Sequence, residues 1–292
     1  HQRDLTNQDT MRGLAEVSFR LKDWGAALTN FQKVLTALAE EDTEQRAEVY
    51  FKLGCVKREQ GQSKQAINNF EKALGVDPNH RATLDALVST YTELKDWKQV
   101  VAYKRQILDS VIEGEERFKL LIEVADIWND NDKNPAKAIE ALEEARELEP
   151  DNRTLLHKLL ALYEATENWS RMIDTIQALA EMEKDPIRKS KFIFTVAQLY
   201  RDKEEDQDRA VDLFNDALDL NPQLLEAFER INKIHTGQKD WKALERAFRK
   251  MLRRLTTSGA GNADLEFNLW HNLGLIYRDR LQDTNSAIEA FK

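Results

Sequence analysis

Residues 47–80 read AEVYFKLGCVKREQGQSKQAINNFEKALGVDPNH, and this stretch decides the fold. Its apolar and small residues fall on two stripes of helical spacing. The first stripe is Tyr50, Leu53 and Gly54, and the second is Ala66, Phe70 and Ala73. Pro78 then closes the stretch, because proline lacks the amide proton that a helix interior requires. The stretch predicts two antiparallel helices that approach closely at Gly54 and Ala66.

The stretch is one copy of an internal repeat. Three tryptophans lie 72 residues apart, at Trp97, Trp169 and Trp241, and the same interval separates Pro78, Pro150 and Pro222. A fixed period of this size predicts a stack of supersecondary units rather than one globular core. The near absence of alternating apolar and polar runs, with 5 prolines and 10 glycines in the chain, predicts that all units are helical.

The unit in residues 47–80 resembles a tetratricopeptide repeat, and only Lys57 departs from the family pattern, at a position that the family fills with tyrosine. The resemblance implies an all-α fold, a right-handed α-α superhelical solenoid of about eight helix-turn-helix repeats that forms a single domain over residues 1–292. The expected repeats, the last incomplete, span residues 8–46, 47–80, 81–117, 118–152, 153–189, 190–224, 225–266 and 267–292.

Odd and even repeats differ at the turn between their helices. Odd repeats have a tryptophan turn, as at Asp96-Trp97 and Asp240-Trp241. The fourth, sixth and eighth repeats instead have a longer acidic loop, at residues 130–132, 202–208 and 279–283. We expect each tryptophan to stabilise the turn by packing on its own repeat, and direct contact with a ligand is the alternative.

Composition limits the classes of partner. A nucleic-acid binder needs a positive surface that displaces counterions, so the formal net charge of -9 argues against RNA or DNA. No run approaches the roughly 18 apolar residues of a membrane-spanning helix. The single cysteine, Cys55, excludes an internal disulfide framework and favours a cytoplasmic location.

The two ends of the chain suggest a longer protein. The chain opens with His1 rather than methionine, and no signal peptide is recognisable. Lys292 follows Phe291 in the middle of an expected second helix. Because solenoid ends usually carry a polar capping element, we expect this chain to be part of a longer array.

Catalytic and metal-binding patterns are not recognisable. The five histidines never lie within one helical turn of each other or of Cys55. Residues 130–134 resemble a calcium loop, but Pro135 replaces the required glycine and Ala141 replaces the bidentate glutamate. No glycine-rich phosphate loop or nucleophile elbow is present either. We therefore expect no metal, no cofactor and no catalytic residue, so that the chain is not an enzyme.

In the family that the chain resembles, the first helices of the repeats line a concave groove, and this implies which residues face a partner. The expected groove residues of the first four repeats are Phe51, Lys52, Arg58, Asp85, Ser89, Ile122, Asp126 and Asp130. Those of the last four repeats are His157, Lys158, Phe194, Gln198, Arg201, Arg230, Lys233, His271, Asn272 and Arg278.

Two patterns within this set predict how a partner binds. Phe51, Ile122 and Phe194 recur at one position of alternate repeats and could anchor apolar side chains of a partner, or they could be half-buried between neighbouring helices. Asp85 and Asp126 belong to an acidic middle region that could hold a basic segment, or that is merely a solvated surface.

A third pattern lies outside the expected groove, on the second helix of the seventh repeat. Its basic residues follow helical spacing opposite an apolar stripe, and they are Arg246, Arg249, Lys250, Arg253 and Arg254. We expect these five basic residues to be solvated on the convex surface, with a site for an acidic partner or a membrane surface as the alternative.

These observations favour a non-catalytic scaffold for protein-protein interaction, which binds a peptide segment or a folded protein in the concave groove. The alternative is a regulatory or recruitment array of a larger enzyme or signalling protein, for example a bacterial assembly or motility scaffold that engages a small GTPase. The sequence specifies neither the partner nor the oligomeric state.

Overall fold

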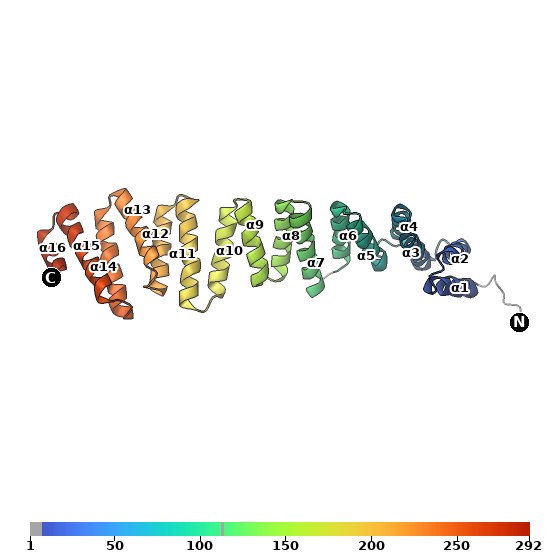
Figure 1. The fold of residues 1–292 in the computed structure, drawn as a ribbon, viewed down its shortest axis with the longest axis horizontal. Coiled ribbons are helices and arrows are strands. Elements are labelled where there is room, and N and C mark those ends of the chain that lie inside the picture. Colours follow the sequence, from blue (N-terminus) through green and yellow to red (C-terminus); the bar gives the residue numbers. More distant parts are fainter. Residues whose placement is uncertain (1–7, 112–113) are drawn as a thin grey trace. The chain divides into compact units, whose positions relative to one another are not determined.

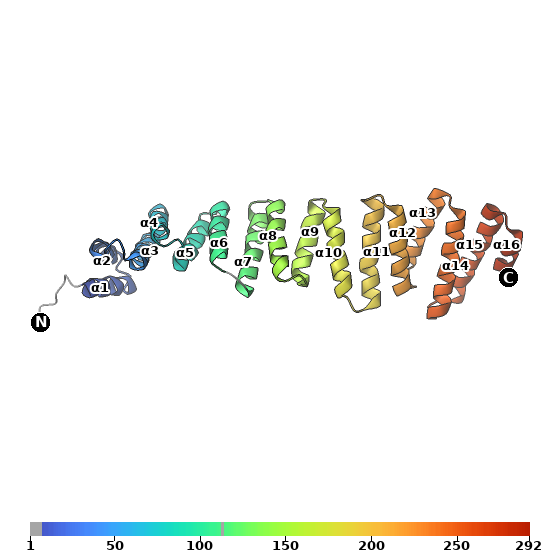
Figure 2. The same cartoon turned by 180° about the vertical axis from the view of Figure 1, so that it is seen from behind.

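The computed structural model describes residues 8–111 and 114–292 (Figure 1). Over these residues it contains sixteen α-helices, two π-helical turns and no β-strand, which confirms the predicted all-α helical repeat. Residues 1–7 of the predicted domain lie outside the described residues, and so do residues 112–113 of its third repeat. Consecutive helices pair as the repeats predict, and Figure 2 shows the same pairs from behind.

The chain divides into two compact units, His1–Glu149 and Pro150–Lys292, which we call unit 1 and unit 2. Each unit holds four of the predicted repeats. The single solenoid over residues 1–292 stays a prediction. The helices of unit 1 are α1 (Gln8–Arg20), α2 (Trp24–Ala37), α3 (Thr43–Glu59), α4 (Ser63–Val76), α5 (Arg81–Glu93), α6 (Trp97–Ser110), α7 (Glu115–Asp126), the π-helical turn η1 (Ile127–Asn131) and α8 (Pro135–Leu148).

The helices of unit 2 are α9 (Arg153–Ala165), α10 (Trp169–Met182), α11 (Pro186–Asp202), α12 (Gln207–Leu220), α13 (Leu225–Gln238), α14 (Trp241–Ser258), α15 (Ala263–Ile276), the π-helical turn η2 (Tyr277–Leu281) and α16 (Thr284–Phe291). Odd-numbered helices are the first helices of their repeats, and even-numbered helices are the second.

All eight turns within repeats have one backbone construction. A residue with positive φ follows the first helix, and the next residue is the N-cap of the second helix. Glycine fills the positive-φ position only in the second repeat, at Gly61, and the other seven turns use Lys, Glu or Gln. In those seven turns an Asp or Asn side chain caps the second helix, as Asp96 does for the Gln99 amide at 3.3 Å.

The fourth, sixth and eighth repeats contain one more residue in this turn. In the third repeat the Asp96 amide donates to the Tyr91 carbonyl, five residues earlier. In the fourth and sixth repeats the Asn134 and Asp206 amides reach back six residues, to the carbonyls of Trp128 and Tyr200. The predicted longer loops of the fourth and eighth repeats are largely helical, whereas residues 203–206 of the sixth repeat lie between α11 and α12. In repeats four and eight the extra residue is part of the π-helical turns η1 and η2, which have a wider turn than an α-helix.

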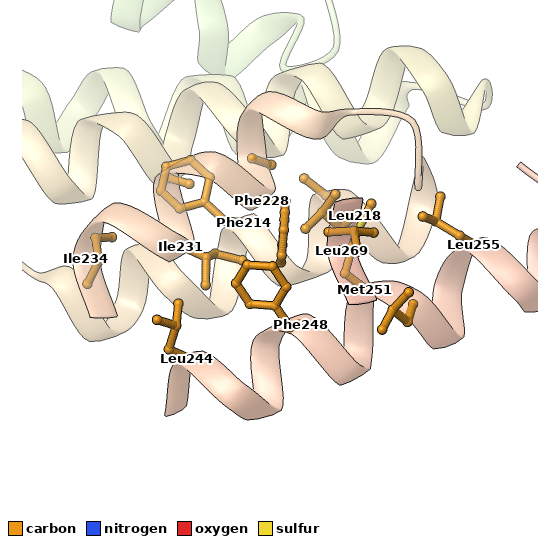
Figure 3. Packing of buried hydrophobic residues seen from close by; sticks show 14 of the residues in the cluster. Phe214, Leu218, Phe228, Ile231, Ile234, Leu244, Phe248, Met251, Leu255 and Leu269 are labelled. Carbon is orange, nitrogen blue, oxygen red and sulfur yellow. The ribbon is translucent and has the colours of Figure 1, made fainter. Parts of the chain in front are cut away.

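The helices of a repeat pack closely at the small residues that the sequence pattern identifies. A Cβ atom on Gly54 would lie 2.4 Å from the Phe70 ring, so only glycine lets α3 approach α4 this closely. In unit 2 the aromatic rings of successive repeats form the core, where Phe248 lies beside Phe228 with ring centroids 5.0 Å apart (Figure 3).

The tryptophan rings at the turns contact the neighbouring repeat as well as their own. Trp24 packs edge-on against Phe19 of its own repeat, with ring centroids 5.6 Å apart. The Lys203 ammonium, from the loop of the next repeat, lies 4.2 Å from the ring centroid of Trp169. Arg280 lies 4.6 Å from the ring centroid of Trp241 in the same way. These rings therefore link adjacent repeats through cation-π contacts, which the prediction of packing on a single repeat missed.

Candidate functional site

In unit 1 the predicted residues of the second repeat form a tightly connected cluster. The Phe51 ring lies against Phe70 and, with ring centroids 5.6 Å apart, against His80. His80 Nε2 lies 3.3 Å from Glu48 Oε2, and Lys52 Nζ lies 3.5 Å from the other oxygen of Glu48. Phe51 and Lys52 are half-buried, so their contacts within the chain already use part of the surface that a partner would need.

Cys55 and Arg58 complete this helix face, and both are half-buried. Burial raises the pKa of the Cys55 thiol to about 11. Since the thiolate is the reactive form, this cysteine is a packing residue rather than a nucleophile.

The acidic middle region of unit 1 is partly neutralised by cations of its own chain. Arg81 donates through Nε to both carboxylate oxygens of Asp85 at 3.1 Å, and it reaches Glu116 at 2.8 Å. Lys104 of α6 pairs with Glu123 of α7 at 2.5 Å. Sequence reasoning missed both cations because Arg81 precedes the expected groove positions and Lys104 lies on a second helix.

The remaining predicted residues of unit 1 lie at separate points along α5, α7 and η1. Ser89 and Asp130 are exposed, and Ile122 and Asp126 are half-buried. Asp130 accepts a hydrogen bond from the Asn129 side chain at 2.8 Å.

In unit 2, three predicted cations converge on one pocket. Arg201 of α11 and Arg230 and Lys233 of α13 line a cavity of about 580 Å³, which Gln207 and Gln238 also border. Arg201 holds Asp202 through two hydrogen bonds of 2.5 and 2.6 Å, and Arg230 donates to Glu226 at 2.9 Å.

The cations of this first pocket differ in how far a neighbouring carboxylate pairs with them. The hydrogen bond that Asp202 accepts from Arg201, together with the charge of Arg230, holds the pKa of the Asp202 carboxyl below its ordinary value. Lys233 is exposed, and Arg230 keeps a buried Nε atom without a hydrogen-bond partner. The pocket therefore offers donors to an incoming carboxylate.

A second pocket of about 350 Å³ lies on the opposite side of α13, against α15. It combines apolar walls from Leu244, Phe248 and Leu275 with the polar side chains of Asn232 and Asn272. Asn232 Oδ1 is buried without a hydrogen-bond partner. Of the predicted groove residues only Asn272 reaches this pocket, and its apolar walls depend on the tilt of α14, which the sequence pattern does not specify.

Phe194 lies in the core. It is 9% exposed and packs against Phe214 with ring centroids 5.4 Å apart, so it offers little area to a partner. The alternative of a half-buried packing position thus describes Phe194 better than the alternative of an apolar anchor.

The other predicted residues of unit 2 do not gather at either pocket. His157 is exposed on α9, and Lys158 and Gln198 are half-buried. His271 stacks on Phe267 with ring centroids 6.0 Å apart, and Arg278 donates through Nε to Asp279 at 2.6 Å.

One of the five basic residues predicted to be solvated on α14 is buried. Arg254 is 8% exposed, because its guanidinium lies against α12. It donates to Asp219 Oδ1 at 2.6 Å and to the Asn215 carbonyl at 3.0 Å. Burial opposes ionisation of Asp219, but Arg254 and Lys250 outweigh this effect and lower its pKa. Arg254 is thus a packing residue, and the exposed basic surface of α14 lacks it.

Within the described part of the chain, no helix is long and apolar enough to cross a membrane. The same part contains no group of three or more His, Cys, Asp or Glu side chains that could hold a metal ion.

Comparison with protein families identifies the repeats at both ends of the array. A tetratricopeptide repeat model matches residues 8–79, and a second model of the same description matches residues 267–292. The helix pairs between them repeat the same turn and packing. The chain contains tetratricopeptide repeats. Their presence supports a general role as a scaffold for protein interaction.

Solved tetratricopeptide proteins resemble this chain at low sequence identity. A tetratricopeptide repeat protein from Parabacteroides merdae is 15% identical with a TM-score of 0.41, over 96% of this chain and 98% of that one. YrrB, described as having an unusual peptide-binding site, is 16% identical with a TM-score of 0.33, over 65% of this chain and 98% of that one. No curated protein matches the sequence.

A further match is a chain from the structure of Naa15/Naa10 bound to HypK-THB. It is 12% identical with a TM-score of 0.49, over 96% of this chain and 43% of that one.

Proposed function

We propose that this chain is a non-catalytic scaffold that binds an extended segment of a partner protein on the first-helix surface of unit 2, which comprises α11, α13 and α15. The observation that carries the proposal is the convergence of Arg201, Arg230 and Lys233 on one open pocket of about 580 Å³. Scattered surface cations contribute little to binding, whereas donors gathered in a concave site bind a carboxylate strongly.

The second pocket extends the proposed site across α13. Its walls at Leu244, Phe248 and Leu275 suit an apolar side chain, and Asn232 and Asn272 offer hydrogen bonds to a peptide backbone. A partner segment with an acidic residue near an apolar residue would therefore occupy both pockets. Buried apolar contacts would supply affinity, and the cations would determine which segments bind.

The basic segment predicted for the acidic region of unit 1 has weaker support. A basic side chain there would compete with Arg81 for Asp85 and with Lys104 for Glu123. Recruitment within a larger enzyme or signalling protein, as the sequence allows, would use the same surface of unit 2. A cytoplasmic location remains part of the proposal on the ground of the lone thiol of Cys55.

Selection from a random peptide library tests the proposed site. The bait is the folded chain, beside the double variant Arg230→Glu/Lys233→Glu and a control with equal charge change, Arg246→Glu/Arg253→Glu on α14. We expect the unaltered chain and the control to enrich the same acidic and apolar motif, and the double variant to lose it. A motif that the double variant retains would place binding elsewhere. Turnover of any substrate by the purified chain would contradict the non-catalytic role.

A further inference from the structure

The second helices α12 and α14 carry opposite charges at four equivalent positions. On α12 these positions hold Asp208, Asp212, Asp216 and Asp219. On α14, 34 residues later in each case, they hold Lys242, Arg246, Lys250 and Arg253. We call these sets the acidic stripe and the basic stripe. Four residues at this helical spacing lie on one face and extend over about 16 Å.

The two stripes are exposed side by side on unit 2. All eight side chains are exposed. The stripes meet at their C-terminal ends, where Lys250 Nζ lies 3.6 Å from Asp219 Oδ2 and the buried Arg254 also binds Asp219. Toward their N-terminal ends, Asp212 and Asp216 on one side and Lys242 and Arg246 on the other make no ion pair among the described residues. Most of the charge on both stripes is therefore available to another molecule.

A surface with one acidic and one basic stripe is complementary to itself. A two-fold axis that lies in the contact plane, parallel to the helices and between them, exchanges the two stripes. It places the acidic stripe of each copy on the basic stripe of the other. Interfaces of this kind, in which the same patch meets itself, are the commonest basis of symmetric dimers.

Other occupants fit this surface less well. A nucleic acid or an anionic membrane is negative over a broad area, so the acidic stripe would repel it next to the basic one. An acidic segment of another protein would satisfy only the basic stripe and would leave the four aspartates of α12 unused.

We propose that the α12–α14 surface of unit 2 binds a second copy of this chain, with the acidic stripe of each copy against the basic stripe of the other. The proposal is independent of the proposed peptide site, because none of the eight stripe residues lines either pocket of that site. Individual exposed ion pairs are weak, so the dimer forms through many pairs together and is sensitive to salt.

Charge reversal tests this arrangement by sedimentation. The first variant, Asp212→Lys/Asp216→Lys, cancels the net charge of the acidic stripe and leaves the basic stripe intact. The second, Arg246→Glu/Arg253→Glu, cancels the net charge of the basic stripe and leaves the acidic stripe intact. Each alone should dimerise about tenfold more weakly or not at all, and an equal mixture of the two should form a one-to-one complex. These variants leave Asp219 and Arg254 in place, so the packing of α12 on α14 is retained.

Matched controls make the same charge change away from the two stripes. They are Glu164→Lys/Glu229→Lys, on α9 and α13, for the first variant, and Lys184→Glu/Lys191→Glu, in the loop before α11 and on α11, for the second. They should dimerise like the unaltered chain. Sedimentation of the unaltered chain should also shift toward the monomer between about 0.01 M and 1 M salt, as the screening length falls from roughly 30 to 3 Å. A monomer at every concentration and salt, or a mixture of the two variants that stays monomeric, would overturn the proposal.

Discussion

Arg254 of α14 and Asp219 of α12 form a hydrogen-bonded ion pair, with 2.6 Å between Nε and Oδ1, which joins the second helices of two successive repeats. The arginine is almost fully buried, while about half of the aspartate side chain remains exposed. The same guanidinium also donates to the carbonyl and side-chain oxygens of Asn215, both at 3.0 Å. One side chain thus bridges three acceptors of the neighbouring repeat.

Replacement of this arginine should weaken unit 2. In Arg254→Met the apolar stem remains, but Asp219 and Asn215 lose their donor, and we expect a loss of about 1–3 kcal/mol in the free energy of unfolding. The matched control is Arg253→Met, because Arg253 is exposed and should change stability by less than about 0.5 kcal/mol. Urea denaturation followed by circular dichroism measures both. Equal stability of the two variants would contradict the bridging role.

A second prediction concerns the closest helix contact of unit 1. A methyl group at Gly54 would overlap the Phe70 ring, because the added Cβ would lie 2.4 Å from ring carbons. Gly54→Ala should therefore destabilise the unit by about 1–3 kcal/mol. Gly75→Ala in the adjacent helix α4 is the control, since nothing lies within 4 Å of its added Cβ, and helix propensity alone should stabilise it by up to about 1 kcal/mol. Thermal unfolding that fails to separate the two variants would show that Phe70 moves aside freely.

These examples show which parts of the fold the sequence predicts. The close approach at Gly54 is predictable because one glycine lies on the apolar stripe that meets Phe70, and both belong to a single repeat. The burial of Arg254 is not, because its helical spacing continues the basic stripe of α14. Its position at the edge that faces α12 depends on how the helices of two repeats tilt against each other.

The same limit applies to the candidate site. The family pattern names Arg201, Arg230 and Lys233 one by one, but their convergence depends on the relative tilt of α11 and α13. Phe194 occupies an expected groove position and yet turns into the core, because the Phe214 ring of its own repeat offers it an apolar surface. The extra residue in the fourth and eighth repeats is visible in the sequence, but its π-helical conformation is not.

His235 on α13 should make stability depend on pH. Burial, helped by the charge of Arg246, lowers the pKa of this histidine below its ordinary value, although Asp240 acts in the opposite direction. Its buried Nδ1 has no hydrogen-bond partner. Because the folded state favours the neutral form, His235 contributes stability that is present above its unfolded pKa of about 6.5 and is lost as pH falls through its folded pKa.

Nuclear magnetic resonance titration of the His235 imidazole checks this directly, with a pKa expected below the ordinary histidine value of about 6.5. In His235→Gln the loss of stability on acidification from about pH 7 to 5 should be smaller than in the unaltered chain. An identical acid dependence of the two proteins would show that His235 does not contribute.

The turns within repeats offer a stabilising change. Lys95 has φ of 58° in the turn between α5 and α6, a left-handed conformation that costs a residue with a Cβ atom about 1–2 kcal/mol. Lys95→Gly removes this cost but gains entropy in the unfolded chain, so we expect a net stabilisation of about 0.5–1 kcal/mol. Lys72→Gly, on the exposed face of α4, has no such strain to relieve and should destabilise by about 1 kcal/mol. The measurement is the difference in urea midpoint between the two variants, and it also tests the shared turn. If Lys95→Gly destabilises as much as Lys72→Gly, the left-handed turn conformation at Lys95 is wrong.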